Sequence, residues 1–333
     1  MKTIAQLLAS VRTESWPIRG GFRIARGARA AADVVVVELH DQGCAGRAEC
    51  VPYARYGESI ESVRSQIEAG CRDLGGVDAR AQTLAMPAGA ARNAIDCALW
   101  ELEAKRAGMP AWELAGLGGP PPDVHTMRTV SVDTAENMKV AASALADARV
   151  IKVKVDGGAD LDRIAAVHEG APNAKLVIDA NEAWSADQLA TWLPLLPKLG
   201  VSVVEQPLPA DDDAALDRLE RAVPICADET FHDRKSFSSV ERRYDMVNIK
   251  LDKTGGLTEA LYCVGEARRL GLQLMIGCMV STSLAIEPAL LLASDAEYVD
   301  LDGPLLLQTD REDARHDRES GLLRSSSAVW GAA

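Results

Sequence analysis

The second part of the chain alternates between short apolar runs and longer segments with helical periodicity. The apolar runs are rich in Val, Ile and Leu, which is typical of strands buried on both faces. We expect strands at residues 125–132, 149–155, 175–179, 201–206, 224–228, 244–250, 272–278 and 296–302. Helical segments such as 134–148 and 256–271 lie between them. This alternation predicts parallel βαβ units, and eight such units most simply close into a (β/α)8 barrel of the TIM type.

An open doubly wound sheet is the alternative architecture for the same alternation of strands and helices. That fold binds its ligand at a glycine-rich phosphate loop directly after the first strand. No glycine-rich loop of this kind follows the first predicted strand. The closed barrel is therefore the preferred interpretation.

The first part of the chain mixes both kinds of pattern. The run DVVVVELH at 33–40 predicts a strand, and the turn DQGCAG leads into a second strand, RAECVPY, at 47–53. Two segments with helical periodicity follow, at 60–74 and 88–108. This order of elements predicts a small α+β domain ahead of the barrel.

A segment rich in glycine and proline, GLGGPPPD at 116–123, separates the two regimes. Such a segment is typical of a domain boundary. We therefore expect an α+β domain over residues 1–118, the barrel over 119–303, and a polar C-terminal segment over 304–333. The last segment is expected to pack on the first domain or on the outside of the barrel.

Composition narrows the class of protein. The chain has 333 residues, of which 47% are hydrophobic, and a formal net charge of −13. A nucleic-acid binder needs a basic patch, and the sequence shows none. The seven cysteines form no CxxC pair, which indicates reduced, buried thiols. No signal-peptide core is visible, and no apolar run reaches the roughly 18 residues of a membrane span, so we expect a cytoplasmic protein.

Three consecutive predicted strands end in a carboxylate. Asp179 follows LVI, Glu205 follows VSVV and Asp228 follows PICA. Because active sites of such barrels lie at the carboxyl ends of the strands, these acids should converge on one small volume. Their mutual repulsion would be relieved by a hard divalent cation, and oxygen ligands suit Mg²⁺. Alternatively, each acid caps the following helix or pairs with a nearby lysine.

Lysines end two further strands. In IKVKV at 151–155, Lys152 and Lys154 share one face because strand side chains alternate. If they point inward, burial and like charge should lower a lysine pKa and create a base. A solvated strand edge is the alternative. Lys250 ends the strand opposite among the eight, so two lysines would face a substrate from both sides, as 1,1-proton transfer requires.

The last predicted strand ends in YVDLDGP, in which Asp300 and Asp302 share a face. They lie away from the three other acids and could hold a substrate ammonium. The alternative is a tight turn before Gly303 and Pro304, where Asp is common.

Together these motifs resemble the enolase superfamily, its muconate-lactonising-enzyme subgroup, and within it the dipeptide epimerases. The motifs that carry the resemblance are KVK, IDANEAW, VEQPLP, ICADET, VNIKLDKTGGLTEAL and DLD, with ECVPYARYGES in the first domain. The resemblance implies an isomerase in which an α+β capping domain, built from the N-terminal segment and the C-terminal tail, covers a (β/α)8 barrel. The best-known activity of these relatives is epimerisation of L-Ala-D-Glu to L-Ala-L-Glu in the reuse of murein peptides.

The resemblance also implies roles for individual residues. Asp179, Glu205 and Asp228 would bind one Mg²⁺ per subunit, which would stabilise an enediolate. Lys154 would be the acid/base on one face and Lys250 on the other. Lys152 would lower the pKa of Lys154 and touch the substrate carboxylate. Asp300 and Asp302 would bind the α-ammonium of the dipeptide.

Side-chain specificity is expected from a loop of the capping domain, RGGFRIARGAR at 19–29. Arg26 or Arg29 could hold a glutamate carboxylate by a bidentate pair, and Arg55 and Tyr56 are further candidates. The arginines could equally be solvated loop charges. Relatives can carry a basic residue where this chain has Leu284, which leaves the side-chain preference open.

Three other functions stay open at this point. A cycloisomerase, an o-succinylbenzoate synthase or an N-acylamino acid racemase of the same superfamily would act on substrates without a free α-ammonium, and the paired Asp300 and Asp302 argue against them. A Schiff-base aldolase would leave the three acids unexplained, and a binding barrel would leave the opposed lysines unexplained. The expected partners are a small dipeptide and further copies of the chain in a homo-oligomer, with neither nucleic acid nor membrane.

Overall fold

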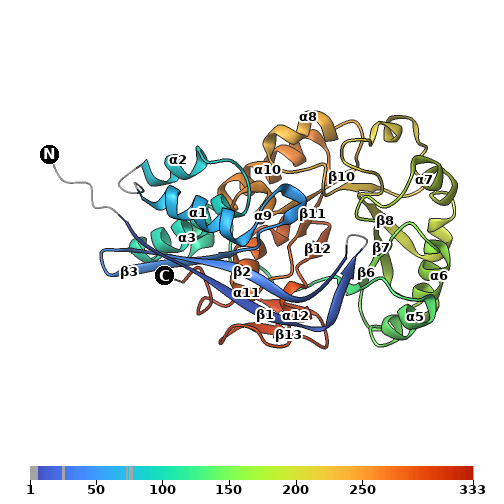
Figure 1. Cartoon of the computed structure of the whole chain (residues 1–333), viewed down its shortest axis with the longest axis horizontal. Helices are drawn as coiled ribbons and strands as arrows, with labels where there is room; N and C mark the ends of the chain where they lie inside the picture. Colours follow the sequence, from blue (N-terminus) through green and yellow to red (C-terminus); the bar gives the residue numbers. More distant parts are fainter. Residues whose placement is uncertain (1–6, 25–26, 73, 75–77, 333) are drawn as a thin grey trace.

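The computed structural model describes residues 7–24, 27–72, 74 and 78–332. The chain forms two parts that lie next to each other (Figure 1). One part is built on a three-stranded antiparallel sheet, and the other on an eight-stranded sheet. None of the described helices is both long and apolar enough to cross a membrane.

The eight-stranded sheet forms the predicted barrel. Its strands are β5 (Arg128–Val130), β6 (Val150–Lys154), β7 (Lys175–Asp179), β8 (Val201–Glu205), β9 (Ile225–Ala227), β10 (Met246–Lys250), β11 (Gln273–Gly277) and β12 (Tyr298–Asp300). They pair in chain order and all pairs are parallel. The N–H of Met127 donates to Val299 O over 2.8 Å and brings the first and last strands together. The prediction of a (β/α)8 barrel is confirmed.

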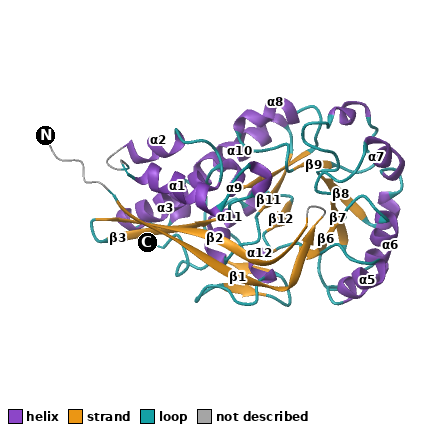
Figure 2. Ribbon diagram, in the orientation of Figure 1, coloured by secondary structure: helices purple, strands orange, loops and turns teal. Residues whose placement is uncertain are grey.

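Helices connect the strands and cover the outside of the barrel (Figure 2). The α-helices are α5 (Ala135–Ser143), α6 (Asp160–Gly170), α7 (Ala186–Trp192), α8 (Phe237–Val240), α9 (Leu251–Thr254), α10 (Leu257–Leu270), α11 (Ser283–Leu290) and α12 (Gly303–Leu306). The 3-10 helices are η3 (Leu196–Leu199), η4 (Ala214–Arg218), η5 (Arg234–Ser236) and η6 (Ala293–Asp295). Strands and helices therefore alternate as the apolar pattern indicated.

Strand alternation separates the barrel interior from its outer layer. One buried cluster fills the interior with side chains from successive strands: Met127, Val177, Val203, Cys226, Met246 and Met275. On β6, Ile151 and Val153 belong instead to the main core under the helices. Lys152 and Lys154 have the opposite orientation, because successive side chains of a strand point to opposite faces. The carboxyl end of the barrel interior is therefore polar above an apolar floor.

The N-terminal part is an α+β unit. Its sheet has the order β1 (Leu8–Ile24), β2 (Gly27–Asp41) and β3 (Cys44–Cys50). Its helices are η1 (Ala54–Tyr56), α1 (Ile60–Cys71), α2 (Ala79–Leu84), α3 (Ala90–Ala107) and α4 (Ala111–Leu114). The long hairpin of β1 and β2 reaches from this unit across to the barrel (Figure 1). We call this unit the cap.

The C-terminal segment contacts both parts. Strand β14 (Leu322–Arg324) pairs with β13 (Arg315–Asp317) and with β4 (Val124–His125), next to the barrel. Farther along, Trp330 Nε1 donates to Cys97 O at 3.3 Å, and the N–H of Ala111 donates to Gly331 O at 3.2 Å. These last contacts complete the packing around α3 of the cap and support our proposal that the C-terminal segment belongs with it.

The expected specificity loop at 19–29 is mostly not a loop. Strand β1 continues to Ile24 and β2 begins at Gly27. Phe22 pairs with Arg29 and Ile24 with Gly27, after a register shift beyond Pro17. The glycines and arginines of residues 19–29 are typical of a loop, which is why the sequence predicted one. In the structure, pairing between β1 and β2 makes most of this stretch a hairpin.

Gly46 marks a close approach of β3 to helix α3. A Cβ atom at Gly46 would lie 2.2 Å from Ala98 O and 2.4 Å from Leu102 N. Because both atoms belong to the helix backbone, the helix would have to shift. We expect Gly46→Ala to lower the free energy of unfolding by about 2–3 kcal/mol in urea titrations.

The control is Gly265→Ala in α10, where a Cβ atom would meet nothing within 4 Å. This substitution should raise the free energy of unfolding by up to about 1 kcal/mol, since alanine favours a helix interior. Equal effects of the two changes would contradict the close approach at Gly46.

Candidate active site

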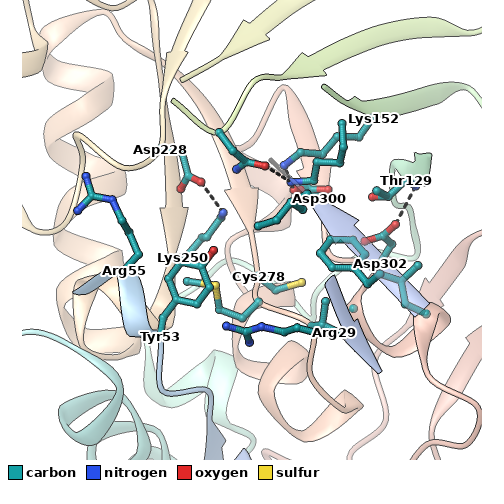
Figure 3. A pocket seen from close by; sticks show the side chains of 18 of the residues that line it. Arg29, Tyr53, Arg55, Thr129, Lys152, Asp228, Lys250, Cys278, Asp300 and Asp302 are labelled. Carbon is teal, nitrogen blue, oxygen red and sulfur yellow. Dashed lines mark hydrogen bonds and ion pairs between the residues drawn. The ribbon is translucent and has the colours of Figure 1, made fainter. Parts of the chain in front are cut away.

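A cavity of about 420 Å³ lies between the cap and the carboxyl ends of the barrel strands. The cap contributes Phe22, Ile24, Arg29, Tyr53 and Tyr56 to its wall. The barrel contributes charged residues from four strand ends: Lys152, Lys154, Asp228, Lys250, Asp300 and Asp302. Figure 3 shows Lys152, Asp228, Lys250, Asp300 and Asp302 around the cavity. Six of the predicted barrel residues therefore line one cavity, whereas Asp179 and Glu205 do not line it and instead lie beside Lys152.

Strand register aligns the predicted acids and lysines. Lys154 pairs with Asp179 across β6 and β7, and Asp179 pairs with Glu205 across β7 and β8. Asp228 directly follows β9, whose last residue is Ala227. All three acids are buried, with at most 2% of their surface exposed. They lie at the carboxyl ends of neighbouring strands, as the barrel topology requires.

Ammonium groups lie between these carboxylates. Lys152 Nζ is 3.0 Å from Asp179 Oδ2, 2.7 Å from Glu205 Oε2 and 2.6 Å from Asp300 Oδ2. Lys154 donates to Asp179 Oδ2 at 2.5 Å. Lys250 donates to Asp228 Oδ2 at 2.7 Å (Figure 3). Each predicted lysine is thus paired with a predicted acid.

Neighbouring carboxylates set the direction of the pKa shifts of Lys152 and Lys250. Burial lowers the pKa of Lys152, but Asp179, Asp300 and Glu205 outweigh it and hold that pKa well above its ordinary value. Burial acts on Lys250 in the same way, and Asp228 raises its pKa well above the ordinary value. The predicted lowering concerned Lys154, with Lys152 as its cause, so it stays a prediction. The sequence showed the neighbouring lysines but not the short distances between Lys152 and the acids.

The acids respond in opposite directions. Burial and the neighbouring Asp179 raise the pKa of Glu205 to about 7. Burial by itself would raise the pKa of Asp228. The charges of Lys250, Lys253 and Lys152 outweigh this effect and hold that pKa well below its ordinary value. The nearby ammonium groups therefore do not offset the burial of Glu205, whereas they more than offset the burial of Asp228.

The donor set fits a hard divalent cation. Glu205 Oε2 is buried and has no hydrogen-bond partner among the described residues, although the ammonium of Lys152 is close to it. Among the described residues, no group of three Asp, Glu, His or Cys side chains is arranged to hold a metal ion. At this site the ammonium group of Lys152 lies between the carboxylates. Three buried carboxylates that offer only oxygen donors are nevertheless the ligand type that Mg²⁺ prefers.

Two polar residues at this site were not predicted. Lys253 is fully buried, and its ammonium donates to Asp228 Oδ1 at 2.6 Å, Asp228 O at 2.6 Å and Asn248 O at 3.0 Å. Gln206 Oε1 accepts from the N–H of Asp228 at 2.9 Å. A signal for Lys253 exists in the sequence, because it follows Lys250 by three residues and so lies one helical turn away.

Asp300 and Asp302 lie at the end of β12. Asp300 is paired with Lys152, and Asp302 Oδ2 accepts from the N–H of Thr129 at 2.9 Å (Figure 3). Burial and the charge of Asp300 raise the pKa of Asp302 to about 6. Both carboxylates line the cavity, so a cation of the substrate can reach them.

The four candidates for side-chain recognition differ in their surroundings. Arg26 lies outside the described residues. Arg29 lines the cavity, and its Cζ is 5.2 Å from the centroid of the Tyr53 ring. Arg55 also lines the cavity, but its guanidinium is engaged with Glu182 at 2.7 and 2.8 Å. Tyr56 packs edge-on against His232, with centroids 4.5 Å apart.

Family comparisons cover both parts of the chain. Residues 7–116 match the N-terminal domain of the mandelate racemase / muconate lactonizing enzyme family. Residues 133–319 match the family described as enolase C-terminal domain-like.

Two curated relatives extend along nearly the whole chain. The L-Ala-D/L-Glu epimerase of Escherichia coli is 48% identical over 304 residues, which cover 90% of this chain and 94% of the relative. The N-acetyl-D-glutamate racemase of Pseudoalteromonas is 40% identical over 303 residues, which cover 90% of this chain and 96% of the relative.

Solved structures agree with these relatives. An enolase family member from Agrobacterium tumefaciens, solved with sodium, L-Ala-L-Glu and an ordered loop, has a TM-score of 0.93 and 44% identity, covering 98% of this chain and 100% of its own. A dipeptide epimerase from Cytophaga hutchinsonii, solved with Mg and D-Ala-L-Val, has a TM-score of 0.89 and 26% identity, covering 97% and 94%. The chain belongs to the mandelate racemase / muconate lactonizing enzyme family of the enolase superfamily, and it is an enzyme of the isomerase class.

Proposed function

We propose that this enzyme is a dipeptide epimerase that inverts the α-carbon of the C-terminal residue, with L-Ala-D/L-Glu as its preferred substrate pair. One observation carries the proposal: Lys154 and Lys250 line one buried cavity from β6 and β10. Three strands separate β6 from β10 in either direction around the barrel. A substrate held between them therefore meets an ammonium or amine on each face.

The two lysines would divide the proton transfer between them. One neutral lysine removes the α-proton from its face, and the other, as an ammonium, donates a proton to the opposite face. The same pair works in reverse when the other isomer binds. Lys152 lies between the carboxylates with 2% of its surface exposed, and it would contact the substrate carboxylate.

Asp179, Glu205 and Asp228 would hold Mg²⁺ in this proposal. The ion would supply Lewis-acid stabilisation of the negative charge that develops on the substrate carboxylate. The support from this chain is that the three carboxylates are buried at the ends of neighbouring strands and offer only oxygen donors. The structure of the Cytophaga relative was solved with Mg and a dipeptide.

The ends of the cavity account for the choice of dipeptide. Asp300 and Asp302 would bind the α-ammonium, since both are buried and carry charge opposite to it. Arg29 would bind the glutamate side chain from the cap side of the cavity. The 48% identity with the Escherichia coli L-Ala-D/L-Glu epimerase supports the same substrate.

A second candidate function is racemisation of an N-acylated glutamate. It is favoured by the 40% identity with the Pseudoalteromonas N-acetyl-D-glutamate racemase. The two substrates share an acylated glutamate and differ in the ammonium that only the dipeptide carries. The two buried carboxylates at the end of β12 favour the dipeptide, because its ammonium adds a charge opposite to theirs and an uncharged acetyl group adds none.

The first experiment is incubation with L-Ala-L-Glu and Mg²⁺ in D₂O, followed by NMR of the glutamyl α-proton. We expect loss of that signal together with appearance of the L,D diastereomer. Further L-Ala-L-X and L-X-L-Glu dipeptides and N-acetyl-L-glutamate form the comparison panel. A chelator should stop exchange, and added Mg²⁺ should restore it.

Each other result has a definite meaning. Exchange without inversion would show that only one lysine reaches the α-carbon. Exchange in N-acetyl-L-glutamate but in none of the dipeptides would replace the first function by the second. Exchange that survives the chelator would remove the metal from the proposal.

A further inference from the structure

A bidentate ion pair connects the cap to the barrel at the edge of the cavity. Arg55 Nε donates to Glu182 Oε2 at 2.8 Å, and Arg55 Nη2 donates to Glu182 Oε1 at 2.7 Å. Arg55 lies in η1 of the cap, and Glu182 lies three residues beyond the end of β7. Only 10% of the Glu182 side chain is exposed, against 37% for Arg55. Such parallel charge-assisted bonds fix direction as well as distance.

The barrel holds Glu182 firmly. Glu182 Oε1 also accepts from the N–H of Ala210 at 2.9 Å, and the N–H of Glu182 donates to Gln206 O at 2.9 Å. Its backbone has a φ of 71°, in the left-handed region that a side chain such as glutamate seldom adopts. The preceding Asn181 accepts from Lys154 at 3.4 Å. Glu182 is therefore a fixed point on the same loop that borders the catalytic lysine.

Arg55, the cap residue of the ion pair, lies next to two tyrosines that line the cavity. Arg55 lies between Tyr53 and Tyr56 in the chain, and the two tyrosine rings are 5.4 Å apart. The Tyr53 ring lies 5.2 Å from Arg29 Cζ, within cation–π range. Figure 3 shows Arg29 beside Tyr53, with the guanidinium of Arg55 turned away from it. Glu182 is thus connected to Arg29 by the ion pair with Arg55, by the short chain segment 53–55, and by the contact of Tyr53 with Arg29.

We propose that Glu182 is a positioning residue for substrate specificity. By engaging Arg55, it fixes residues 53–56 and keeps the Tyr53 ring in place beside Arg29. It also keeps the Arg55 guanidinium away from the substrate, so that Arg29 alone binds the substrate side chain. This inference rests on the proposed function and adds the residue that sets its preference for an acidic C-terminal residue.

The test compares L-Ala-L-Glu with L-Ala-L-Gln in the Glu182→Gln variant. The amide keeps the volume of the side chain but removes its charge. We expect the ratio of kcat/KM for the Glu dipeptide over the Gln dipeptide to fall by about fivefold to tenfold, through the KM for L-Ala-L-Glu. For L-Ala-L-Gln, kcat should stay within about twofold, because the lysines are untouched.

The matched control is Glu259→Gln. Glu259 on α10 makes the same kind of fork with Arg234, at 2.8 and 2.6 Å, with side-chain exposures of 5% and 43%. That pair does not line the cavity, so the ratio should not change. Arg55→Gln should reproduce the effect of Glu182→Gln, and the double variant should add no further loss, since the two residues act as a unit.

A second readout does not depend on turnover. Trypsin cuts after arginine, so cleavage of the Arg55–Tyr56 bond, followed by mass spectrometry, reports whether the segment is fixed. We expect faster cleavage of this bond in Glu182→Gln than in wild type or in Glu259→Gln. If wild type exchanges no dipeptide α-proton, faster cleavage would retain the fixing role while the proposed function fails. An unchanged Glu/Gln ratio with active wild type, or a higher one, would overturn the proposal, as would an unchanged cleavage rate.

Discussion

Lys154→Ala and Lys250→Ala should each abolish epimerisation, and each should leave proton exchange on one face of the substrate. We expect the rate of inversion to fall by at least about 10³-fold, since a general acid or base contributes roughly 10²–10⁴ and both lysines act in every inversion. Exchange should survive for the isomer whose α-proton faces the remaining lysine. The two variants should therefore fail on opposite isomers of Ala-Glu, which NMR in D₂O distinguishes.

The two substitutions differ in what they leave behind. Without Lys250, Asp228 keeps the ammonium of Lys253 at 2.6 Å. Without Lys154, Asp179 keeps Lys152 at 3.0 Å. Neither change strands a buried carboxylate without a cation, so both variants should remain folded. Lys198→Ala, in η3 and exposed, controls for the substitution itself. Exchange of both isomers in either variant would contradict the assignment of one lysine to each face.

Replacing Asp302 by Asn should separate dipeptides from N-acetylated substrates. We expect kcat/KM for L-Ala-L-Glu to fall at least about 30-fold, the cost of removing one partner of a buried charge pair. Any turnover of N-acetyl-L-glutamate should change far less, because its acyl group carries no ammonium. The measurement is α-proton exchange for both substrates at equal enzyme concentration.

Asp302 is a sharper target than Asp300. Asp300 is paired with Lys152 at 2.6 Å, so Asp300→Asn would also disturb the lysine that lies between the acids. Asp302 accepts a backbone N–H from Thr129, which an Asn oxygen can still accept. The double variant Asp300→Asn/Asp302→Asn should lose dipeptide turnover entirely. Equal losses for dipeptide and N-acetyl substrate would remove the role in ammonium binding.

The charged residues at the strand ends could be predicted from the sequence, because two rules of local structure are sufficient to bring them together. Period-two alternation places Lys152 and Lys154 on one face, and parallel strands bring their carboxyl ends together. The structure accordingly places Asp179, Glu205, Asp228 and Lys250 around one cavity or directly behind it. No knowledge of distant contacts was needed for this part of the site.

Properties that depend on distant contacts could not be predicted. The partner of Arg55 is Glu182, which lies 127 residues away in the sequence, so Arg55 read as a candidate for the substrate. The raised pKa of Lys152 reflects first Asp179 and then Asp300, of which Asp300 is 148 residues away in the sequence. Residues 19–24 read as a loop because the pairing that makes them a strand was not visible in their own composition.

The packing of the C-terminal segment on the cap has a consequence for synthesis of the protein. Arg47 Nη2 donates to Ala328 O at 2.9 Å and to Val329 O at 2.8 Å, so a residue near the start of the chain needs residues that follow the whole barrel. A ribosome makes the N-terminal parts of a protein first, and domains generally fold as they emerge. The cap can make these contacts only after the barrel has been translated. The part of the chain that we propose to select the substrate therefore completes its packing after the part that we propose to carry the chemistry.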